Sequence, residues 1–144
     1  MNNPFQMLLA GADNIQRALA DDTTTMSLAL EQRMVAVQAH QEAKQAYEEA
    51  EAEFKFEFMF SDEAYGKAKV ADAKLILDRA IIAARGAGPL AQPWRILNAC
   101  KADLDNAQMA YDQAEVRFKA VRVAAELQAS MLLGLAADAK LLRG

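Results

Sequence analysis

The sequence predicts an all-α protein: an elongated, coiled-coil-like helical hairpin with a very long C-terminal helix, which assembles into an oligomer. The 144 residues are dominated by Ala, Leu, Glu, Gln, Lys, Arg and Met, all strong helix formers. Val and Ile are few, and no stretch has the pattern of a strand–helix–strand unit. In the final third, apolar and small residues keep a heptad spacing for about six heptads, which is typical of coiled coils.

The first apolar stretch, residues 5–20, predicts a short helix. The polar run Asp21-Asp22-Thr23-Thr24-Thr25 follows, and because such residues favour turns and caps, we expect the helix to break there. This divides the chain into an N-terminal arm, residues 1–24, and a helical hairpin domain, residues 25–144. The arm either packs on its own chain or docks on a partner. Its apolar side consists of Phe5, Leu8, Leu9, Ala12, Ile15 and Leu19.

A second helix is expected over residues 26–59, with a mostly 4-3 spacing. Its last residues, 54–60, alternate aromatic and polar side chains, a pattern that also fits a short β-ribbon. The preceding Ala/Glu-rich sequence favours a helix, in which aromatic residues four apart pair on two faces. Both faces need covering, so we predict an intersubunit core of Phe54, Phe56, Phe58 and Phe60. The expected inner positions are Leu30, Met34, Val37, Gln41, Lys44, Tyr47, Glu51, Phe54 and Phe58.

A third helix is expected over residues 62–85, with Ser61-Asp62-Glu63 as its turn and cap. Gly66 weakens its first turn. The sequence Gly86-Ala87-Gly88-Pro89 then marks the clearest break in the chain, with glycine after a helix and proline before the next. The face expected to pack consists of Val70, Ala73, Leu77, Ala80, Ile81 and Ala84.

The final helix is expected over residues 94–142 and carries the most regular spacing. At ~1.5 Å per residue it is about 70 Å long, although Gly134 could kink it. No other predicted helix has equal length, so we expect the spacing to serve contacts between copies, with Leu104, Tyr111, Phe118 and Leu132 at the interface. We call the following positions the heptad seam: Leu97, Cys100, Leu104, Ala107, Tyr111, Ala114, Phe118, Val121, Ala125, Gln128, Leu132, Leu135, Ala139 and Leu142.

No constellation of residues indicates catalysis. The only histidine, His40, is expected on a helix surface or between helices, and Cys100 falls in the heptad seam. Gly86-Ala87-Gly88-Pro89 lacks the Lys and Ser/Thr of a phosphate-binding loop. We therefore expect no enzyme activity, no cofactor, no metal and no small-molecule substrate.

Charge is segregated along a chain of net charge −4. Residues 42–57 hold six acids and two bases, whereas residues 67–95 hold six bases and two acids. The basic stretch either binds a nucleic-acid backbone or pairs with the acidic helix. Tyr65 and Trp94 flank it and could stack on bases, although a Trp at a helix start is also a common core anchor. The bases are Lys67, Lys69, Lys74, Arg79, Arg85 and Arg95.

The N-terminus lacks the positive start of a signal peptide, and no apolar run approaches the ~20 residues that span a bilayer. We therefore expect a cytoplasmic protein that does not enter membranes.

The order of features resembles the T4-type phage recombination mediator and similar small helical phage recombination proteins. The matching stretches are Tyr47 to Phe60, then Tyr65-Gly66-Lys67-Ala68-Lys69, then Trp94 to Cys100, within residues 45–130. The final helix carries Arg and Gln at similar places, as in Arg117-Phe118-Lys119 and Glu126-Leu127-Gln128. Two features differ from the family, since this chain is acidic and its last helix is longer.

The resemblance implies a homo-oligomer, a ring in this family, that binds single-stranded DNA and helps load a recombinase onto strands coated by single-strand-binding protein, in the bacterial host cytoplasm. It requires no nucleotide or metal. The candidate DNA-binding residues are Lys67, Lys69, Lys74, Arg79, Arg85, Trp94 and Arg95. The alternatives are a virion or tail-assembly protein and a helical adaptor or inhibitor of a host protein.

Overall fold

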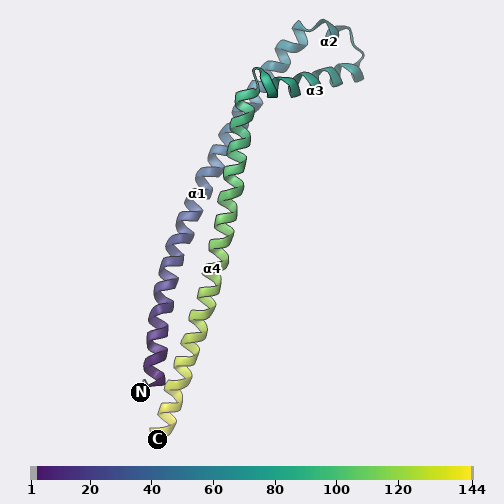
Figure 1. Ribbon diagram of the computed structural model, residues 1–144. Helices are drawn as coiled ribbons and strands as arrows, with labels where there is room; N and C mark the ends of the chain where they lie inside the picture. Colours follow the sequence, from purple (N-terminus) through teal and green to yellow (C-terminus); the bar gives the residue numbers. More distant parts are fainter. Residues whose placement is uncertain (1–2, 144) are drawn as a thin grey trace. The chain divides into compact units, whose positions relative to one another are not determined.

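The computed structural model describes residues 3–143, which form four helices and no strand. They are α1 (Pro4–Ser61), α2 (Glu63–Lys67), α3 (Val70–Ala87) and α4 (Ala91–Arg143), labelled in Figure 1. The predicted all-α class is confirmed. Residues 54–60 are helical, so the β-ribbon alternative is wrong.

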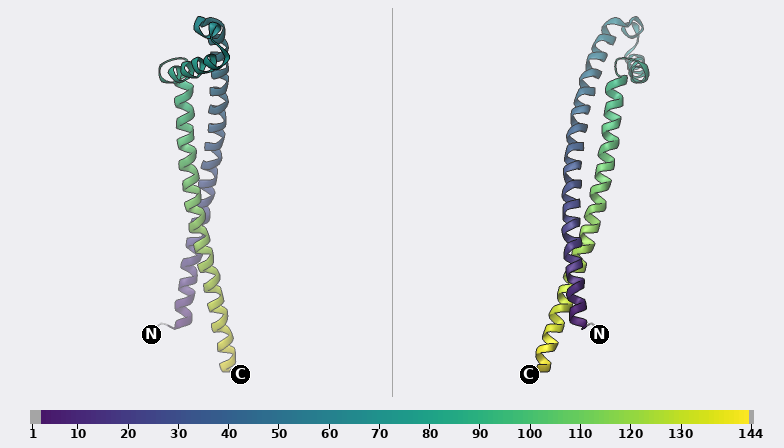
Figure 2. Two further views of the ribbon diagram at one scale, coloured as in Figure 1. Left: turned by 90° about the vertical axis from the view of Figure 1, so that its right-hand side faces the viewer. Right: turned by 60° about the vertical axis from the view of Figure 1, so that its left-hand side comes forward.

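The chain divides into two compact units. Unit 1 comprises Met1–Arg33 and Ala107–Gly144, and unit 2 comprises Met34–Asn106. Helix α1 is divided between the two units, and so is helix α4, so each unit contains one segment of each helix. Within each unit these segments run side by side in opposite directions, as Figures 1 and 2 show from different sides. The antiparallel helix pairing of the predicted hairpin is therefore present within each unit.

The predicted break at residues 21–25 is absent, because α1 continues through it. Each threonine hydroxyl donates to the carbonyl oxygen four residues earlier: Thr23 to Leu19 (2.7 Å), Thr24 to Ala20 (3.1 Å) and Thr25 to Asp21 (3.0 Å). The side chains thus satisfy their polar groups within the helix instead of capping a new one. The expected arm is consequently part of a 58-residue helix.

The predicted inner face of α1 is wrong in register over residues 30–44. Leu30, Met34 and Val37 are exposed, with 62% of Met34 accessible, and Gln41 and Lys44 are exposed too. The buried positions lie one residue earlier, at Ala29 and Ala43. The inner face is lined with alanine, which lets two helix backbones approach closely. The two registers merge at Tyr47, which is buried as predicted.

The heptad seam of α4 is confirmed from Leu97 to Leu135, where every seam position is partly or fully buried. Ala139 and Leu142 are exposed. The expectation that the seam has no partner within the chain is wrong, because α1 covers it. In unit 1, Gln128 Nε2 donates to the Leu8 carbonyl oxygen (2.8 Å), and the Arg33 guanidinium lies 4.1 Å from the centre of the Tyr111 ring.

One polar pair interrupts the apolar packing of unit 1. Asp22 is only 8% exposed, and its Oδ1 lies 3.4 Å from Nε of Arg117. Its other oxygen, Oδ2, is buried with no hydrogen-bond partner within residues 3–143. Arg117 itself keeps 77% of its side chain accessible.

The predicted third helix is two helices. Asp62 caps α2, accepting a 2.8 Å hydrogen bond from the Tyr65 N–H as the sequence suggested. Ala68 and Lys69 are extended, so the chain leaves the helix after Lys67 and α3 starts at Val70. Val70 was expected on the packed face but is exposed, because it begins α3 at the free end.

The expectation that no stretch is apolar enough to span a bilayer requires correction. Helix α4 contains an 18-residue window with mean hydropathy 1.3 and at most two charged residues, and none of that window is buried. By length and composition alone, this helix could cross a membrane.

Candidate nucleic-acid interface

The core of unit 2 fixes α3 against α1 and α4. Tyr47, Ile81, Ala84 and Leu90 are buried together, and Leu90 is fully inaccessible. Gly88 follows α3 and packs closely on it, since a Cβ at this position would lie 3.1 Å from the Ala84 Cα. Partly buried residues surround this cluster: Ala50, Phe54, Leu77, Trp94 and Leu97.

Two of the residues predicted to bind DNA are engaged in this core. The Arg85 Nε donates a 2.6 Å hydrogen bond to the Tyr47 hydroxyl oxygen, and the guanidinium lies over the Trp94 ring at 4.0 Å. The Tyr47 and Trp94 rings are 5.2 Å apart. Of the two interpretations of Trp94 from the sequence, base stacking and core anchor, the structure shows the core anchor. We therefore omit Arg85 and Trp94 from the candidate interface.

Four other predicted bases are exposed and close together in sequence. Lys67 ends α2, Lys69 directly precedes α3, and Lys74 and Arg79 lie on α3. We call these four the basic segment. Arg95 is also exposed, but it lies on α4, directly after Trp94.

The basic segment is not neutralised by the acidic part of α1. Within residues 3–143, none of its four cations lies within 4.0 Å of a carboxylate oxygen. The acidic stretch pairs locally instead, with Lys55 Nζ 3.2 Å from Glu51 Oε1 one turn away. Within residues 3–143, no ion pair therefore joins the basic stretch to the acidic stretch of α1.

An open groove of about 500 Å³ lies beside the basic segment. Its walls come from the end of α1, from the α2–α3 connection and from α3. Gly66 and Ala68, which alternate with Lys67 and Lys69 along the chain, form part of it, and Lys74 is its only charged lining residue. The complete lining is Met59, Tyr65, Gly66, Ala68, Val70, Ala73, Lys74 and Leu77. We call this the α2–α3 groove.

Aromatic residues at the end of α1 pair on two faces, as predicted. Phe54 stacks on Phe58 (5.9 Å between ring centres), and Phe58 meets the edge of Tyr65 (6.0 Å), which holds α2 to α1. Phe56 and Phe60 pair at 4.8 Å, and they are 66% and 80% exposed. An intersubunit role for all four phenylalanines stays a prediction.

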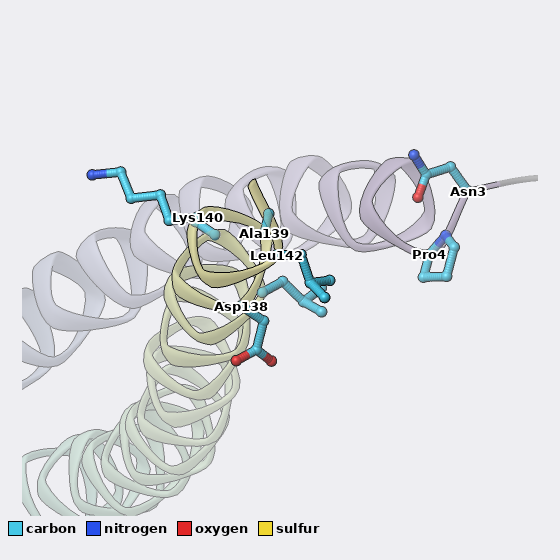
Figure 3. A pocket seen from close by; sticks show the side chains of 8 residues that line it. Asn3, Pro4, Asp138, Ala139, Lys140 and Leu142 are labelled. Atoms are coloured by element: carbon cyan, nitrogen blue, oxygen red, sulfur yellow. The ribbon is translucent and has the colours of Figure 1, made fainter. Parts of the chain in front are cut away.

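A larger hollow of about 610 Å³ lies in unit 1, between the start of α1 and the end of α4 (Figure 3). Pro4, Leu135 and Leu142 contribute apolar surface to it. The charged side chains of Asp138 and Lys140 extend in different directions in Figure 3 and do not converge on a common ligand position. Among the described residues, no group of three or more His, Cys, Asp or Glu residues is arranged to hold a metal ion.

The sequence identified the cations of the interface but not its groove. The groove depends on the chain leaving the helix at Ala68 and Lys69, and the only signal for that was the weak turn at Gly66. Comparison of the chain with protein-family models, curated proteins and solved structures found no match.

Proposed function

We propose that this protein binds single-stranded DNA through the basic segment and the α2–α3 groove, as a non-enzymatic accessory factor of phage recombination or replication. The observation that carries the proposal is a set of exposed cations, with no ion-pair partner among residues 3–143, beside an apolar groove that contains an aromatic ring.

The cations supply the affinity. Phosphates of a single strand release counterions when lysine or arginine neutralises them, and this term is independent of sequence. Because no carboxylate lies within 4.0 Å of Lys67, Lys69, Lys74 or Arg79 among the described residues, binding breaks no ion pair within this region. A net charge of −4 repels DNA elsewhere, which favours a single localised site.

The groove supports a preference for single strands. Bases of a single strand are unstacked and can lie against apolar and aromatic side chains, whereas the bases of a duplex are enclosed. Tyr65, Met59 and Leu77 offer such surface next to Lys74. The recombinase-loading role rests on the family resemblance, and the DNA site rests on this geometry.

Fluorescence anisotropy with a labelled oligothymidylate, titrated with salt, tests the proposal. The triple variant Lys67→Glu, Lys69→Glu, Lys74→Glu should weaken binding equally for all sequences. Losing three phosphate contacts should flatten the log–log salt slope by about 2, at about 0.7 per contact.

The matched control is Lys44→Glu, Lys101→Glu, Lys140→Glu, in which three exposed lysines outside the basic segment change the net charge by the same amount. The control should bind nearly as well as the wild type. Equal losses in both triples would show that net charge alone matters. Failure of the wild type to bind at ~50 mM salt, where such contacts are strong, would reject the proposal.

A further inference from the structure

A second heptad pattern runs along the outer face of α4 in unit 1. Successive positions step by 4 and 3 from residue 109 to residue 141, and every one is exposed. None is charged. We call this set the outer stripe: Met109, Gln113, Val116, Ala120, Val123, Leu127, Ser130, Gly134, Ala137 and Leu141.

The outer stripe is separate from the heptad seam. At 100° per residue, the two sets lie about 180° apart around the helix, so α1 covers one face and leaves the other open. A shallow apolar groove lies on the stripe, lined by Met109, Val116 and Ala120 among others. A sustained heptad pattern of uncharged residues on an open face indicates a partner helix.

We propose that the outer stripe is a self-association surface, on which α4 of a second copy packs as a parallel coiled coil. The stripe is about 50 Å long, at ~1.5 Å per residue. Its heptad pattern continues for longer than the roughly three to four heptads that indicate a coiled coil. Large residues at Val116, Val123 and Leu127 alternate with small ones at Ala120 and Gly134. Gln113 is a polar residue within the stripe, the kind of position that fixes register.

The flanking charges favour a second copy in the parallel direction. In a parallel coiled coil, a residue that flanks the interface on one helix faces the residue five positions further along on the partner helix. Asp112 of one copy would therefore face Arg117 of the other, a pair of opposite charges. One heptad further along, Lys119 would face the uncharged Ala124, so this arrangement places no like charges opposite each other. Asp112 is held one turn from Gln108 (2.9 Å), and Arg117 is largely exposed, so both remain accessible.

A membrane is the less suitable occupant, because the apolar residues form a stripe rather than a continuous belt. Arg122 and Glu126 lie on the same stretch of α4, 3.8 Å apart. Opposite the stripe, the heptad seam is packed on α1 in unit 1.

Sedimentation equilibrium or light scattering tests the proposal on the full chain. The wild type should be dimeric or larger at micromolar concentration. Val116→Glu with Val123→Glu should raise the dissociation constant by at least about 100-fold, because each interface would bury unpaired charges. The control pair, Ala129→Glu with Ala136→Glu, adds the same charge at exposed positions of α4 that lie about 130° around the helix from the centre of the stripe, and it should leave assembly intact. Circular dichroism confirms that both variants stay helical.

Direction is tested by cross-linking. With Cys100→Ser to remove the native thiol, Ser130→Cys should form a covalent dimer on oxidation, since a parallel pair in register places both residues 130 together. A monomeric wild type, or a stripe variant that assembles like the wild type, would overturn the proposal. Binding to anionic vesicles that is lost in the stripe variant, with a monomeric wild type in solution, would assign the stripe to a membrane instead. These readouts need no DNA, so their failure leaves the DNA proposal standing.

Discussion

The guanidinium of Arg85 lies over the Trp94 ring, with 4.0 Å between its central carbon and the ring centre, while its Nε donates to the Tyr47 hydroxyl oxygen. One side chain therefore joins α3 to α4 and to α1. Arg85 comes from the basic stretch of the sequence, yet its contacts stabilise the core of unit 2.

We expect Arg85→Ala to lower the free energy of unfolding by about 1–3 kcal/mol, since it removes a cation–π contact and a hydrogen bond to a buried tyrosine. Arg79→Ala, an exposed arginine on the same helix, should change it by less than about 0.5 kcal/mol. Urea unfolding of both variants measures the difference. Equal effects would show that the Arg85 contacts add nothing to stability.

Ala43 tests the close approach of helices in unit 2, because it is buried on the inner face of α1. Ala43→Leu should destabilise the protein by about 1–3 kcal/mol through overpacking. Ala46→Leu, one turn along on the exposed face, should be nearly neutral, because the helix propensity of Leu is only slightly below that of Ala. If Ala43→Leu is also neutral in a thermal melt, the packing of the two helices is looser than described.

Asp22 is a buried carboxylate with one oxygen unpartnered within residues 3–143, and its partner Arg117 remains in contact with solvent. We expect Asp22→Leu to raise stability by about 1–3 kcal/mol, because burying that carboxylate costs more than its one ion pair returns. Asp21→Leu on the exposed face serves as the control. A lower Tm for Asp22→Leu would mean that the pair stabilises unit 1.

Phe58 and Phe56 lie on different faces of α1 and should respond differently to truncation. Phe58→Ala removes contacts with Phe54 and Tyr65 and should cost about 2–4 kcal/mol, somewhat below the value for a fully buried phenylalanine. Phe56→Ala should change the stability of a single chain by less than about 0.5 kcal/mol. If Phe56→Ala is less stable than the wild type, and the difference grows with protein concentration, Phe56 lies in the predicted intersubunit core.

The sequence predicted α4 better than α1 for a physical reason. The seam of α4 contains large residues such as Leu104, Tyr111 and Phe118, so its heptad register is unambiguous. In α1 the buried positions over residues 29–43 are the alanines Ala29 and Ala43, and the larger Met34 side chain is exposed. Assigning the larger side chains to the core displaced the predicted register by one residue.

The break at residues 21–25 was predicted from capping preferences, which act when a side-chain oxygen accepts a hydrogen bond from a backbone N–H in the first turn of the following helix. Here the hydroxyls of Thr23, Thr24 and Thr25 instead donate to carbonyl oxygens one turn earlier. The candidate DNA site was predicted in its charges and missed in its shape, because the extended residues Ala68 and Lys69 carry no strong helix-breaking signal.

The five-residue helix α2 has a consequence for local stability. It contains no buried residue and is held by the Asp62 cap and the Tyr65 ring contact, so it opens at little cost in free energy. Its backbone amides should therefore exchange with deuterium well before those around Leu90. Single-stranded DNA bound in the α2–α3 groove would slow this exchange. Deuterium uptake at residues 63–69 therefore reports directly whether DNA occupies the groove.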